Sequence, residues 1–467
     1  MTPRPTQSGQ PVQPVPGRGR SHELTLTVGA PAHGGHCVAR PVDDPAGRVI
    51  FVRHALPGET VRARLTEMTS RTWRADAVEI LQASPDRVES VWPEAGPAGV
   101  GGGELAHVAL DAQRTWKRWV LADCLRRIGG QEVADAVASL PEATAGAAVP
   151  IEPMPTDAAA QASTSARRRA LAGTATRTRV SLTVSDDGEP GMHAFRSGTV
   201  LPLRRLPLAV PAINEIGLLE RSRWRAHYRP GMRIEAIAPS AGEPVVLLDG
   251  LPLTAQARST GRRRVQEVVD ASALGLGELT YSVHADGFWQ VHVDAPRVLV
   301  ERVVRAALGE DLERAAGSRV LELYSGAGLF TLPLAALVGD TGRVLSLEGS
   351  EQAVRDARRT LHGHPAARLA VGRVSTRTVR ELAGAFTGAR PDVVVLDPPR
   401  QGAGREIIEA VAALGAERIV LVACDPAALA RDTGTVLRAG YRLGSLSALD
   451  MFPHTHHFET IAVLDRA

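Results

Sequence analysis

Cysteine is scarce in this sequence of 467 residues: only Cys37, Cys124 and Cys424 occur, and they stand far apart. Three scattered thiols cannot build a disulfide framework, and their spacing is not that of a metal site. The low cysteine content therefore excludes a small disulfide-stabilised domain and leaves each thiol to be explained by its own surroundings.

Long apolar runs are also missing. No uninterrupted stretch approaches the roughly 18 residues that a membrane span needs, and the N-terminus lacks the apolar core of a signal peptide. We therefore expect a cytoplasmic protein without a membrane-spanning segment, and we expect it to be a monomer.

Lysine is almost absent, since Lys117 is the only one, and the formal net charge is only +3. Abundant arginine and alanine together are typical of a biased codon composition, so arginine content alone is weak evidence of nucleic-acid binding. Local clustering is more informative, because residues 196–233 contain eight arginines against Glu215 and Glu220. We expect a basic face there that holds phosphates; the alternative is a solvated surface that merely reflects the bias.

The length allows two or three domains, and the residue pattern divides the chain into four segments. Residues 1–20 are proline-rich without an acid, which predicts a disordered tail. Residues 21–82 alternate apolar and polar positions between turn signals, which predicts a small antiparallel barrel. Residues 83–280 are mostly strand-like and predict a β-rich middle domain, with the Ala/Pro-rich stretch 131–165 expected as a loop or insertion. Residues 281–467 predict an α/β domain.

Two helices are expected from local signals. The stretch after Leu110 is amphipathic and would place Trp116, Trp119 and Leu125 on its apolar face. In the α/β domain, Asp294 is expected to cap the first helix, with Pro296 in the first turn.

A glycine-rich loop follows the first predicted strand of the α/β domain. The segment RVLELYSGAGLF (residues 319–330) reads as a strand, a tight turn at Gly326 and Gly328, and a helix. Glu348 ends the next strand, where an acidic side chain holds nucleoside ribose hydroxyls in doubly wound folds. Phe330 stands where a dinucleotide site would want a third glycine, so S-adenosylmethionine fits this pattern better than NAD.

Two apolar runs, VVVLDPPR and RIVLVACDP, end at Asp397 and Cys424, each followed by proline nearby. Both are typical of strands covered on two sides, and the carboxyl ends of such strands carry ligands in open parallel sheets. The alternative is that Cys424 is a buried small hydrophobic residue, the commonest state of a free cysteine. The neighbouring motifs favour a role in chemistry.

These motifs resemble the uracil-5 RNA methyltransferase family, which includes enzymes of transfer and ribosomal RNA. The matching segments occur in the family's order and are GFWQVH (287–292), LELYSGAGLF (321–330), DPPRQG (397–402), ACDPAALARD (423–432) and DMFPHTHHFET (450–460). The similarity covers about the last 190 residues well and the first 82 moderately. The run GRVIFVRHALPGETVRARL resembles the TRAM domain, a small OB-like RNA-binding barrel.

The resemblance implies a Rossmann-like methyltransferase domain that acts on structured RNA, either ribosomal or transfer. Carbon 5 of uracil is a poor nucleophile until a thiolate adds to carbon 6, so the chemistry requires a cysteine and a base. By this similarity Cys424 is the nucleophile and Glu459 the base. The residues implied for S-adenosylmethionine are Gln290, Tyr324, Gly326, Gly328, Glu348 and Asp397. Those implied for the RNA substrate are Phe288, which would stack on a flipped base, together with Asp397 and Arg400.

The chain departs from the family at several positions. Val100 and Gly103 stand where relatives carry iron–sulfur cysteines, so no iron–sulfur cluster is expected, since such a site needs about four thiolates. Asp425 replaces an asparagine and would raise the pKa of the Cys424 thiol. His292 and Leu329 replace polar residues of the cofactor segments.

Alternatives remain open at this stage. The histidines 454, 456 and 457 could bind a metal, but a second ligand pair is missing, and we favour a loop closing over the active site. Glu459 could be a solvated carboxylate and Arg400 a structural ion-pair partner. The whole chain could instead methylate amino groups of nucleic acid, although Arg400 stands where such enzymes carry an aromatic residue, or bind RNA without catalysis.

Overall fold

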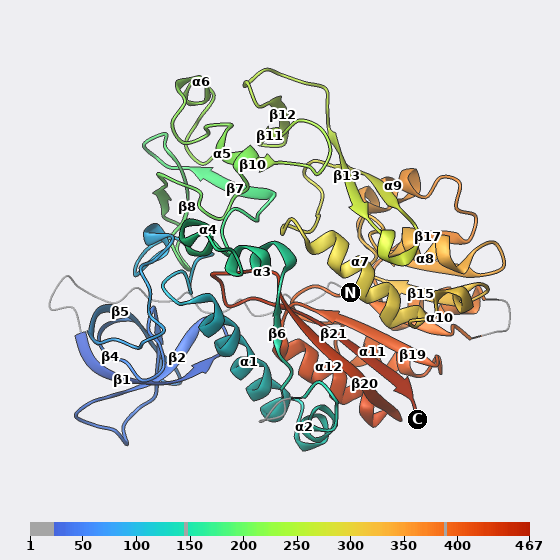
Figure 1. The fold of residues 1–467 in the computed structure, drawn as a ribbon, viewed down its shortest axis with the longest axis horizontal. Helices are drawn as coiled ribbons and strands as arrows, with labels where there is room; N and C mark the ends of the chain where they lie inside the picture. Colours follow the sequence, from blue (N-terminus) through green and yellow to red (C-terminus); the bar gives the residue numbers. More distant parts are fainter. Residues whose placement is uncertain (1–22, 144–147, 387–389) are drawn as a thin grey trace, which may run out of the picture. The chain divides into compact units, whose positions relative to one another are not determined.

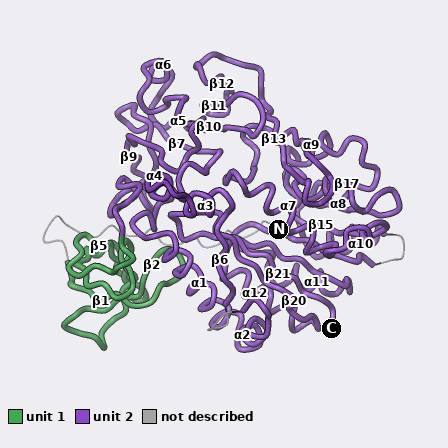
Figure 2. The backbone as a smooth tube through the Cα atoms, viewed as in Figure 1, with its two compact units in different colours: residues 1–87 green, residues 88–467 purple. Residues whose placement is uncertain are grey.

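The structure is a computed structural model that describes residues 23–143, 148–386 and 390–467. The disordered tail predicted for residues 1–20 lies outside these residues. The chain forms two compact units, residues 1–87 and 88–467 (Figure 2). Each unit is described by itself.

The first unit is a closed five-stranded barrel, as the alternation of residues 21–82 predicts (Figure 1). Around the barrel the strands are β1 (Glu23–Ala32), β2 (His36–Pro41), β3 (Ile50–Arg53), β5 (Trp73–Gln82) and β4 (Thr60–Met68). Leu26, Val28, Val61 and Ala63 all point into its buried core. The barrel therefore closes around the inward positions of a period-two pattern.

The second unit contains an antiparallel six-stranded sheet, a two-stranded ribbon and an eight-stranded sheet. The six-stranded sheet runs β12 (Leu251–Thr254), β11 (Val245–Leu248), β10 (Arg233–Ile237), β7 (Arg179–Val184), β8 (Pro190–His193) and β9 (Val200–Pro202). The ribbon pairs β13 (Arg264–Asp270) with β14 (Glu278–His284). These strands lie between residues 179 and 284 and agree with the β-rich character predicted for the later part of the segment 83–280. Its earlier part, as far as the structure describes it, contains helices and only the short strand Ile151–Pro153.

The eight-stranded sheet carries the α/β domain (Figure 1). Its order is β17 (Ala367–Val371), β16 (Arg343–Glu348), β15 (Arg319–Leu323), β18 (Val393–Leu396), β19 (Arg418–Ala423), β21 (Glu459–Arg466), β20 (Tyr441–Asp450) and β6 (Ile151–Pro153). The first five strands are parallel and β21 is antiparallel to β19. The order reverses at β15, so β15 and β18 flank the topological switch point, where ligands bind in such sheets.

Helices cover this sheet. Those of the α/β domain are α7 (Ala295–Leu308), α8 (Thr331–Val338), α9 (Glu351–Thr360), α10 (Thr376–Gly384), α11 (Arg405–Ala412) and α12 (Pro426–Arg438). Earlier in the unit lie α1 (Leu110–Arg127), α2 (Gln131–Ala138), α3 (Pro155–Gln161), α4 (Ala166–Ala170), α5 (Pro211–Asn214) and α6 (Ser222–Arg225). The strands β18 and β19 are almost wholly buried, which explains their continuous apolar sequence.

Two local predictions are wrong. The sequence predicts a loop or insertion for the stretch 131–165, but its described residues are not a loop, because they form α2 and α3 and add β6 as an edge strand parallel to β20. Its alanines favour helix, and Pro155 stands in the first turn of α3, where proline is tolerated. In α1, Trp116 and Leu125 are buried as predicted, but Trp119 is 52% exposed.

The helix start at Asp294 is as predicted, with Pro296 in the first turn of α7. Its carboxylate, however, does not bond the backbone of α7. It accepts hydrogen bonds from the Thr156 amide at 2.7 Å and the Thr156 hydroxyl at 3.0 Å. Asp294 therefore connects α3 to the start of α7 in the α/β domain.

Candidate active site

The predicted site residues gather at the carboxyl ends of the parallel strands. Tyr324 follows β15, Glu348 ends β16, Asp397 follows β18 and Cys424 follows β19. Antiparallel pairing of β19 with β21 sets Ala423 opposite Thr460, so Cys424 and Glu459 occupy the next facing positions. The sheet register alone therefore brings the candidate nucleophile and the candidate base together.

One cavity of about 1090 Å³ joins these groups. Its walls include every predicted site residue except Gly328, namely Phe288, Gln290, Tyr324, Gly326, Glu348, Asp397, Arg400, Cys424 and Glu459. Phe288 is 76% exposed, and an aromatic side chain so exposed beside a cavity is available for stacking. The cavity is large enough for a ligand of nucleoside size with room beside it.

The loop after β15 needs left-handed backbone at several positions. Tyr324 has φ 64°, Gly326 φ 54° and Gly328 φ 87°. A Cβ on Gly328 would lie 3.2 Å from Cβ of Ala357 in α9, whereas one on Gly326 would meet no atom within 4 Å. Gly328 thus serves close packing of the loop on α9, and Gly326 leaves its space open toward the cavity.

Glu348 is fixed by backbone amides. Its Oε2 accepts a hydrogen bond from the Gly326 amide at 3.0 Å, and its Oε1 accepts one from the Ser350 amide at 2.7 Å. The carboxylate therefore spans the glycine loop and the start of α9. This is the place where a ribose is held in doubly wound folds.

Three titratable groups share the cavity wall beside Cys424. Burial and the charge of Glu348 raise the pKa of Asp397 to about 7. Burial and the charge of Asp397 raise the pKa of Glu459 well above its ordinary value. Burial, Glu459 and Asp397 raise the pKa of Cys424 to about 12, with a further contribution from Asp425. The site of the free enzyme therefore favours a thiol over a thiolate.

Helix α12 follows Cys424, the candidate nucleophile, directly in the chain. Asp425 is its N-cap and accepts hydrogen bonds from the Ala427 amide at 3.0 Å and the Ala428 amide at 2.9 Å. The capping role explains why an acidic residue is tolerated beside the thiol. Further along α12, buried Asp432 accepts a hydrogen bond from the Ala403 amide at 2.9 Å. The helix thus also fixes the segment that follows Arg400.

The histidine-rich segment lies along the cavity, as expected for a loop at the active site. Phe452, Thr455 and His457 are among the lining residues. The rings of His456 and His457 are 3.9 Å apart, and His456 pairs with Glu104 at 3.7 Å. Across the described ranges, no group of three or more His, Cys, Asp or Glu side chains could hold a metal ion.

Several lining residues escaped the sequence reasoning. Arg373 follows β17 at the same sheet edge, so the strand-end rule could have identified it. Arg177 and Glu104 also line the cavity but come from distant segments, and no local pattern marks them. Arg179 bonds the carbonyls of Ala285 and Gly287 at 3.0 and 2.9 Å, and so fixes the turn before Phe288.

The two departures in the cofactor segments differ in their surroundings. His292 is buried away from the cavity lining and contacts Asp157 at 3.1 Å. Leu329 lines the cavity, and its carbonyl accepts a hydrogen bond from the Tyr281 hydroxyl at 2.9 Å. The side chain at 292 therefore makes buried polar contacts outside the cavity lining, whereas the one at 329 forms part of the cavity wall.

None of the helices in the part of the chain that the structure describes is both long and apolar enough to cross a membrane.

Comparisons with known proteins show the family of the chain. The family model of the tRNA (uracil-5-)-methyltransferases matches residues 257–467, and the TRAM domain model matches residues 20–78. A protein of Streptomyces avermitilis described as an uncharacterized RNA methyltransferase is 39% identical over 95% of this chain and 98% of its own length. The 23S rRNA (uracil(1939)-C(5))-methyltransferase RlmD of Acinetobacter baumannii is 30% identical over 93% of this chain and 92% of its own.

A solved structure shares the fold. The tRNA (uracil-54, C5)-methyltransferase of Pyrococcus abyssi, solved with S-adenosyl-L-homocysteine, matches with a TM-score of 0.62 at 19% identity, over 96% of this chain and 100% of that one. Together with the sequence matches, this confirms the Rossmann-like methyltransferase domain and the N-terminal TRAM barrel. The chain therefore belongs to the S-adenosylmethionine-dependent uracil-5 RNA methyltransferase family.

Proposed function

We propose that the protein transfers a methyl group from S-adenosylmethionine to carbon 5 of a uridine in structured RNA, through a transient bond between Cys424 and carbon 6 of the base. The observation that carries the proposal is the shared cavity: Cys424, Asp397 and Glu459 meet there with the strand-end residues of a nucleoside site. A buried structural cysteine would have no such cavity.

The residues present fit S-adenosylmethionine. Glu348, at the end of β16, would bind the ribose hydroxyls. Gly326 has no Cβ and so leaves space for the cofactor, and Gln290 and Tyr324 line the same cavity. When bound, the cofactor supplies an electrophilic methyl group and the positive charge of its sulfonium. Neighbouring carboxylates raise the pKa of the Cys424 thiol, so a cation among them would lower it again.

The side chains of the protein form and break one covalent bond to the base and remove one proton from it. The Cys424 thiol gives its proton to solvent, its sulfur adds to carbon 6, and the electron pair of the 5,6 double bond moves into an enolate that is nucleophilic at carbon 5. After carbon 5 has gained the methyl group, Glu459 takes its remaining proton. The electrons of that C–H bond restore the double bond, and the C6–S electrons return to Cys424.

Glu459 suits the role of base because burial and Asp397 raise its pKa, which brings a carboxylate closer to neutral pH as a proton acceptor. Phe288 would stack on the flipped base, and Arg400, which also lines the cavity, would contact a phosphate or the base.

Ribosomal RNA is the favoured substrate. The rRNA enzyme of Acinetobacter baumannii matches nearly the whole chain, including the barrel unit, whereas the tRNA enzyme of Pyrococcus abyssi supports the fold alone. Methylation of an amino group is less favoured, because that reaction has no use for a cysteine beside the reacting base.

The test quantifies 5-methyluridine, site by site, in ribosomal and transfer RNA from cells with and without the gene. We expect one uridine of ribosomal RNA to lose its methyl group, and purified protein with S-adenosylmethionine to restore it. Unchanged 5-methyluridine at every site, with no transfer in vitro, would contradict the proposal.

A further inference from the structure

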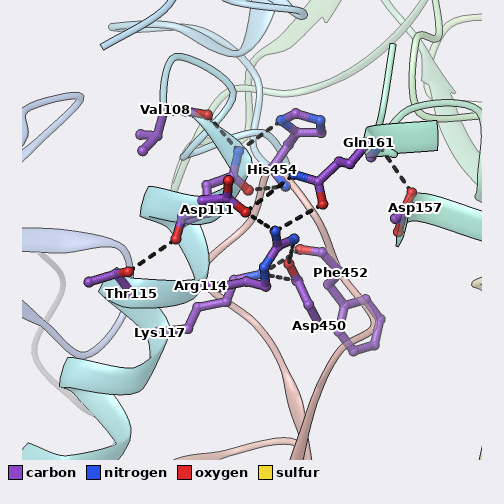
Figure 3. A network of polar contacts seen from close by, with 12 residues as sticks. Val108, Asp111, Arg114, Thr115, Lys117, Asp157, Gln161, Asp450, Phe452 and His454 are labelled. Carbon is purple, nitrogen blue, oxygen red and sulfur yellow. Dashed lines mark hydrogen bonds and ion pairs between the residues drawn. The ribbon is translucent and has the colours of Figure 1, made fainter. Parts of the chain in front are cut away.

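Lys117, the single lysine among 54 basic residues, is completely buried in α1. Its Nζ lies 2.5 Å from Oδ1 of Asp450, also buried, and donates a hydrogen bond to the Phe452 carbonyl at 3.0 Å. Figure 3 shows this ammonium reaching from α1 to the end of β20. A buried charge is retained only where a partner and hydrogen bonds compensate its desolvation.

A second side chain of the same helix holds the same segment. Gln113, four residues before Lys117 and so on the same helix face, accepts a hydrogen bond from the His454 amide at 2.7 Å. Its side-chain amide lies 3.1 Å from Nδ1 of His454. The Leu105 amide donates to the His454 carbonyl at 2.9 Å. Hydrogen bonds from α1 and from the segment before it therefore hold residues 450, 452 and 454 in place.

This segment, residues 450–458, connects the end of β20 to Glu459, the first residue of β21. Phe452, Thr455 and His457 of this segment line the cavity. Glu459 begins β21 and stands opposite Leu449, the neighbour of Asp450 in β20. Cys424 instead depends on β19 and on the Asp425 cap of α12. The Lys117 contacts therefore act on the segment next to Glu459, although α1 itself also packs against α12.

We propose that Lys117, through Asp450 and the Phe452 carbonyl, is a positioning residue that sets Glu459 for proton removal from carbon 5. This inference rests on the proposed function. An ammonium is a compact charge with three donors, whereas a guanidinium is a larger planar fork. All the other residues counted as lysine or arginine are arginines. We infer that a lysine stands at position 117 because the closed site has room for a compact ammonium and not for a guanidinium.

Loss of this positioning has a distinctive consequence. Bond formation by Cys424 and methyl transfer precede the proton removal, so both still occur. The step that slows is loss of the carbon 5 proton, which must happen before the C6–S bond can break. The methylated Cys424–RNA adduct should therefore accumulate during turnover.

The experiment compares wild type with the double variant Lys117→Met/Asp450→Leu, which removes the ion pair without leaving one buried charge alone. Arg126→Met removes an exposed basic side chain from the last turn of the same helix and is the matched control. We measure kcat, both KM values and the fraction of enzyme joined to RNA, by denaturing gel and mass spectrometry. Thermal unfolding reports the folded fraction.

We expect the double variant to lose at least tenfold in kcat with both KM values within twofold, and to accumulate adduct, while Arg126→Met behaves as wild type. Lys117→Arg should also accumulate adduct. Turnover and adduct level like wild type, or a kcat that falls only with the folded fraction, would overturn the inference. RNA with 5-fluorouridine at the target separates the two hypotheses, because absence of any wild-type adduct there would overturn the proposed function itself.

Discussion

At the scale of single residues, the site sets a thiol among carboxylates. Burial raises the pKa of Cys424 most, Glu459, Asp397 and Asp425 raise it further, and Arg400 lowers it. This arrangement favours the thiol over the thiolate in the free protein, so the proposed mechanism requires the bound cofactor or RNA to lower the pKa of Cys424. The sequence indicates the unfavourable effect of Asp425, but the capping role that explains it requires the position of α12.

Asp425→Asn separates these two effects. Asparagine caps helices about as well as aspartate, so stability should hardly change, whereas loss of the negative charge should lower the pKa of Cys424. We expect alkylation of Cys424 by iodoacetamide to become several-fold faster at a fixed pH near 8. Asp425→Ala is the control, because it also loses the cap and should cost about 1 kcal/mol of stability. An unchanged alkylation rate in Asp425→Asn would contradict the electrostatic account.

The pH dependence of kcat/KM follows from the same groups. Glu459 must be ionised to accept a proton, and its pKa is raised well above the ordinary value. The pKa of Asp397 is also raised, to about 7. The rate should therefore fall as pH decreases through these raised values, well above the ordinary carboxylate pKa. A profile measured between pH 5 and 9 that is flat down to pH 5 would show that neither carboxylate needs to be ionised.

At the scale of elements, the carboxyl ends of β15, β16, β18 and β19 and the start of β21 position the site. Strand ends and glycine turns are local signals, and they are enough to predict Gly326, Glu348, Asp397 and Cys424 at one edge. The contributions of β6, α1 and Arg177 depend on long-range packing, which no local pattern encodes. In the stretch 131–165 only the pairing of β6 with β20 depends on such packing, whereas α2 and α3 agree with the local helix preference of alanine.

The two glycines of the loop after β15 should respond differently to alanine. Gly328→Ala combines φ 87° with a Cβ 3.2 Å from Ala357 and should lower the melting temperature by several degrees. Gly326→Ala has φ 54° and open space around its Cβ, so its free energy of unfolding should lie within about 1–2 kcal/mol of the wild-type value. This variant should bind S-adenosylmethionine more weakly. Thermal unfolding and calorimetric titration measure both effects, and the reverse order would refute the assigned roles.

At the scale of the whole molecule, the barrel unit and the arginine-rich stretch 196–233 are candidates for holding RNA outside the active site. The structure reduces the basic face that the sequence predicts, since Arg205, Arg225 and Arg233 pair with Glu94, Glu189 and Glu235. Arg204, Arg221 and Arg229 are exposed, and within the described ranges their side chains have no ion-pair partner. Charge counts along a sequence do not reveal such internal neutralisation.

Replacement of Arg204, Arg221 and Arg229 by alanine should weaken RNA binding and lower the salt dependence of the binding constant, by about 0.9 in logarithmic slope for each phosphate that is no longer neutralised. The kcat at saturating RNA should stay unchanged. Replacement of the paired residues Arg205, Arg225 and Arg233 is the matched control, with a smaller effect expected. Filter binding over a range of salt concentrations decides, and equal slopes for wild type and both triple variants would exclude this stretch from the RNA interface.

The most direct test of the central claim is peptide mass spectrometry of the protein incubated with S-adenosylmethionine and RNA that carries 5-fluorouridine at the target site. Fluorine takes the place of the carbon 5 proton and cannot leave as a cation, so the elimination that breaks the C6–S bond is blocked and the reaction should stop at the adduct. We predict one modified peptide, in which Cys424 carries a methylated fluorouridine nucleotide, and none in Cys424→Ala. An adduct that survives this substitution, or methyl transfer to unmodified RNA by the Cys424→Ala protein, would contradict the account.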